Sequence, residues 1–81
     1  MIDEVREVLR SALQLGARAD RLTADSALLG SIPEFDSMAV VTVLTMMEEE
    51  FGISVADDEV SAEVFQTMGS LAEFVERKVR A

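Results

Sequence analysis

The chain of 81 residues contains no cysteine, no histidine, no tryptophan and no tyrosine, and it has a single proline. Without cysteine there can be no disulfide bond and no thiolate-ligated metal site, and without histidine the commonest metal ligand is missing. The chain also lacks a hydrophobic run near the roughly 18 residues that a membrane-spanning helix requires, and its first residues are acidic, unlike those of a secretory signal. These absences predict a small, soluble cytoplasmic protein with no membrane insertion and no metal centre of its own.

Basic residues are few, because seven Lys and Arg stand against sixteen Asp and Glu and leave a net charge of −9. Such a charge disfavours nucleic acids and anionic membranes as ligands, since both would repel the chain. It suits docking on basic patches of partner proteins, because complementary charge speeds their encounter. The alternative is that the charge only keeps the chain soluble.

Apolar residues recur at helical spacing and predict an all-α fold, a small four-helix bundle. Helices are expected over residues 3–15, with Gly16 as the stop, and over residues 37–51. A short third helix is expected over about residues 56–63, and a last helix after Thr67. Residues 17–36 keep no period and predict a long loop between the first two helices, which its apolar residues would hold against the core. The last helix is expected to turn inward Met68, Leu71, Ala72, Val75 and Val79.

The second predicted helix has more apolar surface than one buried face requires. Its core-facing stripe is expected to contain Val40, Val43, Leu44, Met47 and Phe51. A neighbouring stripe consists of Met38, Val41 and Thr45. Either this helix is buried nearly all round, or the second stripe is a docking surface for partners.

Asp36 and Ser37 stand at the start of that helix. Either residue could be a plain N-cap, because Asp and Ser both rank high at that position. The alternative is that another enzyme modifies Ser37, since a phosphate ester there would lie near the free N–H groups and the positive end of the helix dipole. With no histidine as base and no Gly-x-Ser-x-Gly context, Ser37 is a poor candidate for a hydrolase nucleophile.

The order of these motifs resembles that of acyl carrier proteins of the discrete bacterial type, over essentially the whole chain. The resemblance rests on Leu15-Gly16, a long loop, Asp36-Ser37-Met38, the run Met47-Glu48-Glu49-Glu50-Phe51-Gly52-Ile53, and Thr67-Met68-Gly69-Ser70-Leu71. It implies a single carrier domain over residues 1–81 that folds as a bundle of acyl carrier type.

The resemblance further implies that Ser37 carries 4′-phosphopantetheine, attached by a phosphopantetheinyl transferase that uses coenzyme A and Mg²⁺. Asp36 would help to position that metal and the transferase. The thiol of the arm would carry acyl groups as thioesters between partner enzymes, so the protein would be a carrier and not a catalyst. A monomer is expected, because such a carrier must visit several active sites.

Two departures from the family concern partner recognition. Ala39 and Thr42 occupy positions where typical fatty-acid carriers have acidic residues. Docking is therefore expected to rest on the stripe of Met38, Val41 and Thr45, with Glu48 and Glu49 at the helix end. Phe35, directly before Asp36, is expected to shield the root of the arm or to contact a partner.

The resemblance is compatible with a fatty-acid, polyketide or specialised lipid or polysaccharide pathway. These departures favour a specialised carrier over the housekeeping one for membrane lipids, with a polyketide, a modified lipid, a surface polysaccharide or a peptide pathway as candidates. One alternative is a peptidyl or aminoacyl carrier with the same modified serine. Another is an acidic helical interaction module without a prosthetic group, in which Ser37 is only a cap. A metal-dependent enzyme is disfavoured, because Asp57, Asp58 and Glu59 lack the ligand spacing of a calcium loop.

Overall fold

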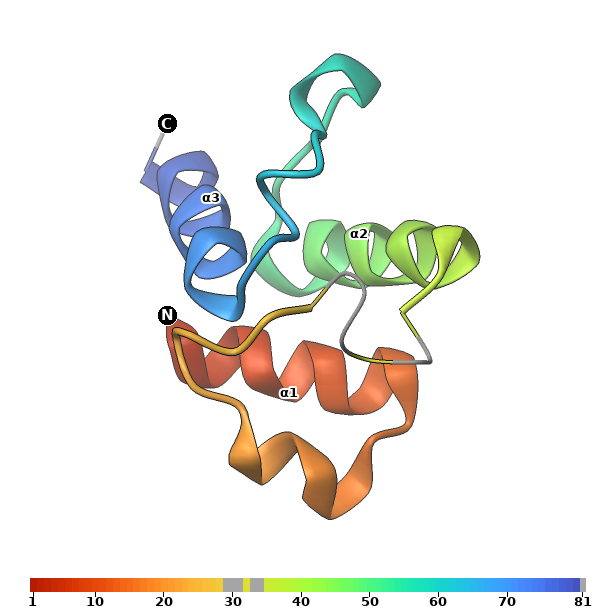
Figure 1. Ribbon diagram of the computed structural model, residues 1–81. Helices are drawn as coiled ribbons and strands as arrows, with labels where there is room; N and C mark the ends of the chain where they lie inside the picture. Colours follow the sequence, from red (N-terminus) through yellow and green to blue (C-terminus); the bar gives the residue numbers. More distant parts are fainter. Residues whose placement is uncertain (29–31, 33–34, 81) are drawn as a thin grey trace.

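The computed structural model describes residues 1–28, 32 and 35–80, and for residue 57 the backbone alone (Figure 1). Within these residues, three α-helices and two 3-10 helices follow one another in the order α1 (Ile2–Leu13), η1 (Gly16–Arg21), α2 (Ser37–Phe51), η2 (Asp57–Glu59) and α3 (Met68–Arg80). The only β-type pairing within the described ranges is an isolated antiparallel bridge between Ala27 and Thr67. The all-α prediction is therefore confirmed.

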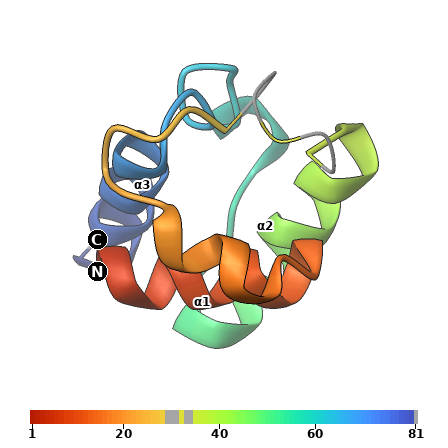
Figure 2. The same ribbon diagram turned by 60° about the horizontal axis from the view of Figure 1, so that its bottom comes forward.

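Helix α1 is the centre of the packing, since it contacts α2, η1 and α3 (Figures 1 and 2). Its residues at helical spacing form a continuous buried stripe: Val5, Val8, Leu9 and Leu13. The opposite face of α1 is charged, as expected for an amphipathic helix on a small core. No described helix is long and apolar enough to cross a membrane.

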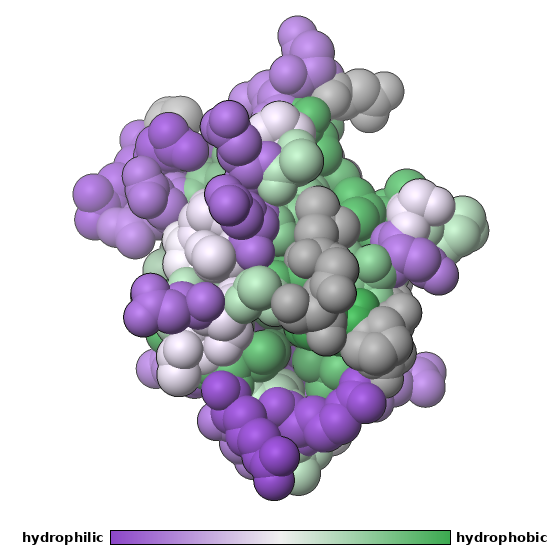
Figure 3. Space-filling model, viewed as in Figure 1, coloured by the Kyte–Doolittle hydropathy of each residue, from purple (hydrophilic) through white to green (hydrophobic). Residues whose placement is uncertain are grey.

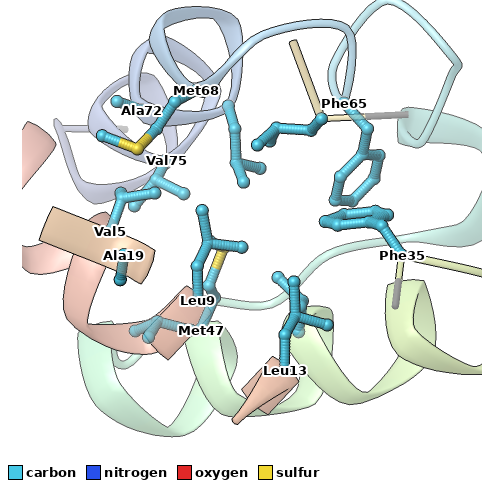
Figure 4. Close-up of a cluster of buried hydrophobic side chains, with 14 of the residues drawn as sticks. Val5, Leu9, Leu13, Ala19, Phe35, Met47, Phe65, Met68, Ala72 and Val75 are labelled. Atoms are coloured by element: carbon cyan, nitrogen blue, oxygen red, sulfur yellow. The ribbon is translucent and has the colours of Figure 1, made fainter. Parts of the chain in front are cut away.

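The core is apolar throughout, and none of the polar or charged residues that the structure describes is buried (Figure 4). Helix α2 contributes Val43 and Met47, and α3 contributes Met68, Leu71, Ala72, Phe74 and Val75. The segments between the α-helices, η1 included, contribute Leu15, Ala19, Leu28, Phe35 and Phe65. Complete burial of a large apolar side chain contributes about 1.5–3 kcal/mol, so these segments add to the stability of the fold beside the helices.

The first helix ends earlier than predicted, at Leu13 and not at residue 15. Gln14 takes a left-handed conformation with φ 53°, and its N–H donates to the carbonyl oxygen of Arg10. This reversal turns Leu15 into the core, where its side chain is 6% exposed. Gly16, also left-handed at φ 58°, then opens η1 and does not cap α1.

The third helix is shorter than predicted, because only the 3-10 turn Asp57–Glu59 forms and the prediction of a helix as far as Glu63 was wrong. Turns follow over residues 62–65 and bring Phe65 into the core, where it is 2% exposed. The chain thus reaches the core through turns and not as a continuous helix.

Helix α3 begins where predicted, at a cap built from two residues. The Ser70 N–H donates to Thr67 Oγ1 at 3.0 Å, and the Thr67 N–H donates to Ser70 Oγ at 3.0 Å. The prediction that Val79 faces inward was wrong, since Val79 is 46% exposed. It lies in the last turn of the helix, one turn beyond the last buried residue, Val75.

The first connection is docked onto the start of α3. The Gly69 N–H donates to the carbonyl oxygen of Ala24 at 2.8 Å, and the Leu28 N–H donates to that of Gln66 at 3.0 Å. A Cβ at position 69 would lie 2.8 Å from the Ala24 oxygen, so only glycine fits this approach. The predicted packing of this connection against the core is confirmed for its described apolar residues, since Leu28 and Phe35 are buried and Leu22 and Ile32 are partly buried, whereas Leu29 lies outside the described residues. The prediction of a fully irregular loop over residues 17–36 was wrong, because its first residues form η1.

Candidate functional site

The candidate site lies at the start of α2, where the chain changes from extended to helical. Asp36 has φ −104° and ψ −173°, and its Oδ1 accepts a hydrogen bond from the Ala39 N–H at 2.8 Å. The Asp36 carbonyl also accepts the first backbone bond of the helix, from the Val40 N–H. Asp36 is therefore the N-cap of α2, which decides between the two residues that the sequence left as candidates.

Ser37 is the first residue of α2, and its side chain is exposed. Its hydroxyl makes no hydrogen bond to the other described residues. Because Asp36 already serves as the cap, the helix start does not need the Ser37 hydroxyl as its cap. An exposed hydroxyl of this kind can be esterified without breaking a bond that holds the helix.

The electrostatics of this position fit a phosphate ester. The first N–H groups of an α-helix have no acceptor within the helix, and together they place about half a positive charge at its start. In α2 the Ala39 N–H donates to the Asp36 side chain, and the Val40 N–H is the first that donates to a backbone carbonyl of the helix start. The N–H groups of Ser37 and Met38 come before these two. A singly charged phosphodiester on Ser37 would therefore be stabilised by about 0.3–1 kcal/mol.

Phe35, predicted to lie at the root of the arm, is part of the core. Its side chain is 5% exposed, and its ring centroid lies 5.6 Å from that of Phe65 with 56° between the ring planes (Figure 4). Phe35 therefore presents almost no surface to a partner in this conformation, which corrects its expected role as a partner contact and agrees with the expectation that it holds the loop against the core. It anchors the chain directly before Asp36.

The second apolar stripe of α2 faces outward. Met38 is 73% exposed and Val41 is 58% exposed, and Thr45 on the same face is exposed as well. The Thr45 hydroxyl donates to the Val41 carbonyl at 3.0 Å, so its methyl group faces away from that bond. The alternative that α2 is buried nearly all round was wrong, and an exposed apolar stripe begins beside Ser37.

The two glutamates predicted as partner contacts differ from each other. The Glu48 carboxylate is half-buried and accepts a hydrogen bond from the Val55 N–H at 2.9 Å. It thereby holds the chain that leaves α2, a role that no sequence pattern indicated because its partner lies seven residues further along. Glu49 is exposed. Of the two, Glu49 is the one that can meet a partner freely.

Hydrophilic residues gather over η1 and over α3 on the face shown in Figure 3, with hydrophobic surface between them.

Nowhere in the described ranges do three or more candidate ligands gather as a metal site would require. The Glu59 carboxylate is bound to Lys78 Nζ at 2.8 and 2.9 Å, and the side chain of residue 57 lies outside the described part of the chain.

Comparisons with known proteins agree with this geometry. The family described as phosphopantetheine attachment site matches residues 3–75. The chain is 31% identical over 68 residues to an acyl carrier protein of Bdellovibrio bacteriovorus, which covers 84% of this chain and 83% of that protein. It is also similar to the solution NMR structure of a holo acyl carrier protein from Nitrosomonas europaea, with a TM-score of 0.92 and 56% identity, covering 99% of this chain and 96% of that one.

Proposed function

The chain belongs to the acyl carrier protein family, whose prosthetic group is 4′-phosphopantetheine, and we propose that this group is attached to Ser37. The observation that supports this site is the exposed Ser37 hydroxyl at the first position of α2, beside a separate N-cap. The arm's thiol would then be the only thiol of the protein, because the chain has no cysteine. Acyl intermediates would be carried on it as thioesters.

The attachment itself is a phosphoryl-group transfer performed by a phosphopantetheinyl transferase. The Ser37 Oγ would form a bond to the phosphorus that carries pantetheine in coenzyme A, while the pyrophosphate bond breaks and 3′,5′-ADP leaves. The hydroxyl proton would pass to a base of the transferase, since this chain has no histidine. The chain would thus be the substrate of the transferase and perform no catalysis of its own.

Asp36 would have two roles in that complex. Its Oδ1 caps α2 by accepting from the Ala39 N–H, and a carboxylate has further lone pairs on both oxygens. The second oxygen is therefore available to help position the Mg²⁺ that accompanies coenzyme A. Carboxylate oxygens are ligands that Mg²⁺ prefers.

Partner enzymes would dock on the exposed stripe of α2 defined by Met38, Val41 and Thr45, with Glu49 at its far end. The stripe begins one residue after Ser37, so a partner that covers it receives the arm at its own surface. Apolar contact would supply affinity, and the acidic end would meet basic groups of the partner. Substitution of Val41 by Asp should slow acyl transfer by partners while leaving the exposed face of the helix folded.

The pathway is proposed only as a class. We place the protein as a single carrier domain, acting as a monomer, in fatty-acid, polyketide or specialised lipid or polysaccharide synthesis. Ala39 and Thr42 support a specialised pathway, because acidic residues beside the arm are replaced there by uncharged ones.

The test is the intact mass of the purified chain after incubation with coenzyme A, Mg²⁺ and a promiscuous phosphopantetheinyl transferase. We expect a gain of about 340 Da, the mass of one phosphopantetheine, and none for Ser37→Ala. A thiol assay gives an independent reading, since the unmodified chain has no thiol and the modified chain should have one. A folded chain that gains no mass with several transferases would refute the proposal.

A further inference from the structure

A second surface, distinct from the stripe on α2, lies where α1 and the C-terminal half of α2 meet. The two helices leave a groove of about 510 Å³ between them. Its rim carries the carboxylates Glu4, Glu7 and Glu50, and its floor is formed by Val8, Met46 and Phe51. The floor remains reachable from outside, because Met46 and Phe51 are only half-buried.

The negative charge of the rim is incompletely balanced. Glu7 pairs with Arg10 at 3.1 Å, and Glu4 lies 3.5 Å from the N-terminal ammonium group. Glu50 is exposed and makes no hydrogen bond or ion pair with any described residue. The whole chain adds a net charge of −9 behind this rim. The groove therefore attracts cations and repels anionic surfaces.

The groove is separate from the modified serine. Ser37 and Glu50 stand at opposite ends of α2, about 20 Å apart at the helical rise of 1.5 Å per residue. At 100° per residue, the groove residues Met46 and Glu50 also point in another direction around the α2 axis than Met38 and Thr45 of the exposed stripe. The difference is about a quarter turn for Met46 and more for Glu50. A molecule bound in the groove would thus leave the exposed stripe uncovered.

We propose that this groove binds a short basic amphipathic helix of a partner protein. One apolar side chain of that helix would lie on the Met46 and Phe51 floor, and flanking Lys or Arg side chains would meet Glu4 and Glu50. The rim on α1 extends from Glu4 to Ser11, about 10 Å, which matches two turns of a helix in a groove. If Ser37 carries the arm as proposed above, a partner held here would recruit the carrier while its arm stays free.

The experiment is a titration of the ¹⁵N-labelled full chain, unmodified and holo, with a synthetic helical peptide of about two to three turns that carries one leucine face flanked by lysines. At low ionic strength we expect saturable amide shifts centred on residues 4–11 and 46–51 in both forms. The double variant Glu4→Gln/Glu50→Gln should weaken binding about fivefold, which corresponds to the loss of two exposed ion pairs with the peptide. The matched pair Asp25→Asn/Glu63→Gln removes the same charge from exposed positions elsewhere and should weaken it less than twofold.

Three outcomes would overturn the proposal: no saturable binding, shifts centred on residues 38–45, or equal weakening by the two double variants. The last would show that the peptide responds only to net charge. Because the unmodified chain is tested beside the holo form, failure of the modification at Ser37 and failure of the groove are read separately.

Discussion

The N-cap of α2 supplies a test that separates the structural role of Asp36 from the chemical role proposed for Ser37. Asp36→Ala removes the acceptor of the Ala39 N–H, a bond of 2.8 Å at an exposed helix start. Loss of such a cap costs about 1 kcal/mol. For 81 residues the unfolding entropy is about 0.17 kcal/mol/K, so the midpoint should fall by about 6 °C.

Two matched variants isolate the cause. Asp36→Asn removes the same charge but keeps a cap oxygen, and Asn is among the best N-cap residues, so its midpoint should stay near that of the unchanged chain. Ser37→Ala breaks no hydrogen bond to a described residue and should shift the midpoint by no more than about 2 °C. Thermal unfolding followed by circular dichroism at 222 nm on the unmodified chains measures all three.

Modification kinetics complete the separation. Ser37→Ala should be folded and unmodified, whereas Asp36→Asn should be folded and modified slowly, because the carboxylate that would help to position Mg²⁺ is gone. A fall of the Ser37→Ala midpoint equal to that of Asp36→Ala would contradict this division of roles, since it would show that Ser37 holds the helix.

Packing contacts and one ion pair supply further predictions. Gly69→Ala should cost about 1–3 kcal/mol in denaturant unfolding, because its Cβ would clash with the Ala24 oxygen; an unchanged midpoint would contradict that contact. Lys78 holds the pKa of Glu59 below its ordinary value, so Lys78→Met should raise that pKa in an NMR titration. In the unchanged chain the ion pair adds to the free energy of unfolding above the pKa that Glu59 has in the unfolded chain, and this contribution is lost as pH falls through the pKa of Glu59 in the folded chain. In Lys78→Met both the contribution and its loss at low pH should be smaller. Phe35→Ala should lose about 3–5 kcal/mol and largely unfold, while Phe35→Leu stays folded; a stable Phe35→Ala chain defective only in acyl transfer would instead make Phe35 a partner contact.

The bounds of α2 were predictable because their causes are local. An N-cap residue precedes the helix, and a glycine follows it: Gly52 has φ 65°, and its N–H donates to the Glu48 carbonyl. Both signals depend on a few neighbouring residues and appear directly in the sequence. The same holds for the cap of α3 at Thr67.

The ends of α1 and η2 were not predictable from local signals, because long-range packing determines them. Gln14 adopts a left-handed conformation without being glycine, and this turn buries Leu15 in the core. Likewise the chain leaves η2 for turns that lead Phe65 to Phe35. Neither aromatic residue carries a local mark of its partner, which is why the sequence predicted that Phe35 helps to hold the loop against the core but did not predict its contact with Phe65.

The assignment of the cap shows what geometry adds at the site itself. Asp and Ser rank alike as N-caps, so the pair Asp36-Ser37 is ambiguous until the backbone is known. The extended ψ of −173° at Asp36 places the last non-helical residue there, and Phe35, buried against Phe65, holds the chain on the approach. Because the core fixes Phe35 and Asp36 caps the helix, Ser37 is left at the first helical position with a hydroxyl that bonds to none of the described residues. A serine that served as the cap would lose its hydrogen-bond geometry on esterification, so this division of roles is what allows a bulky group at the start of α2 without cost to the helix.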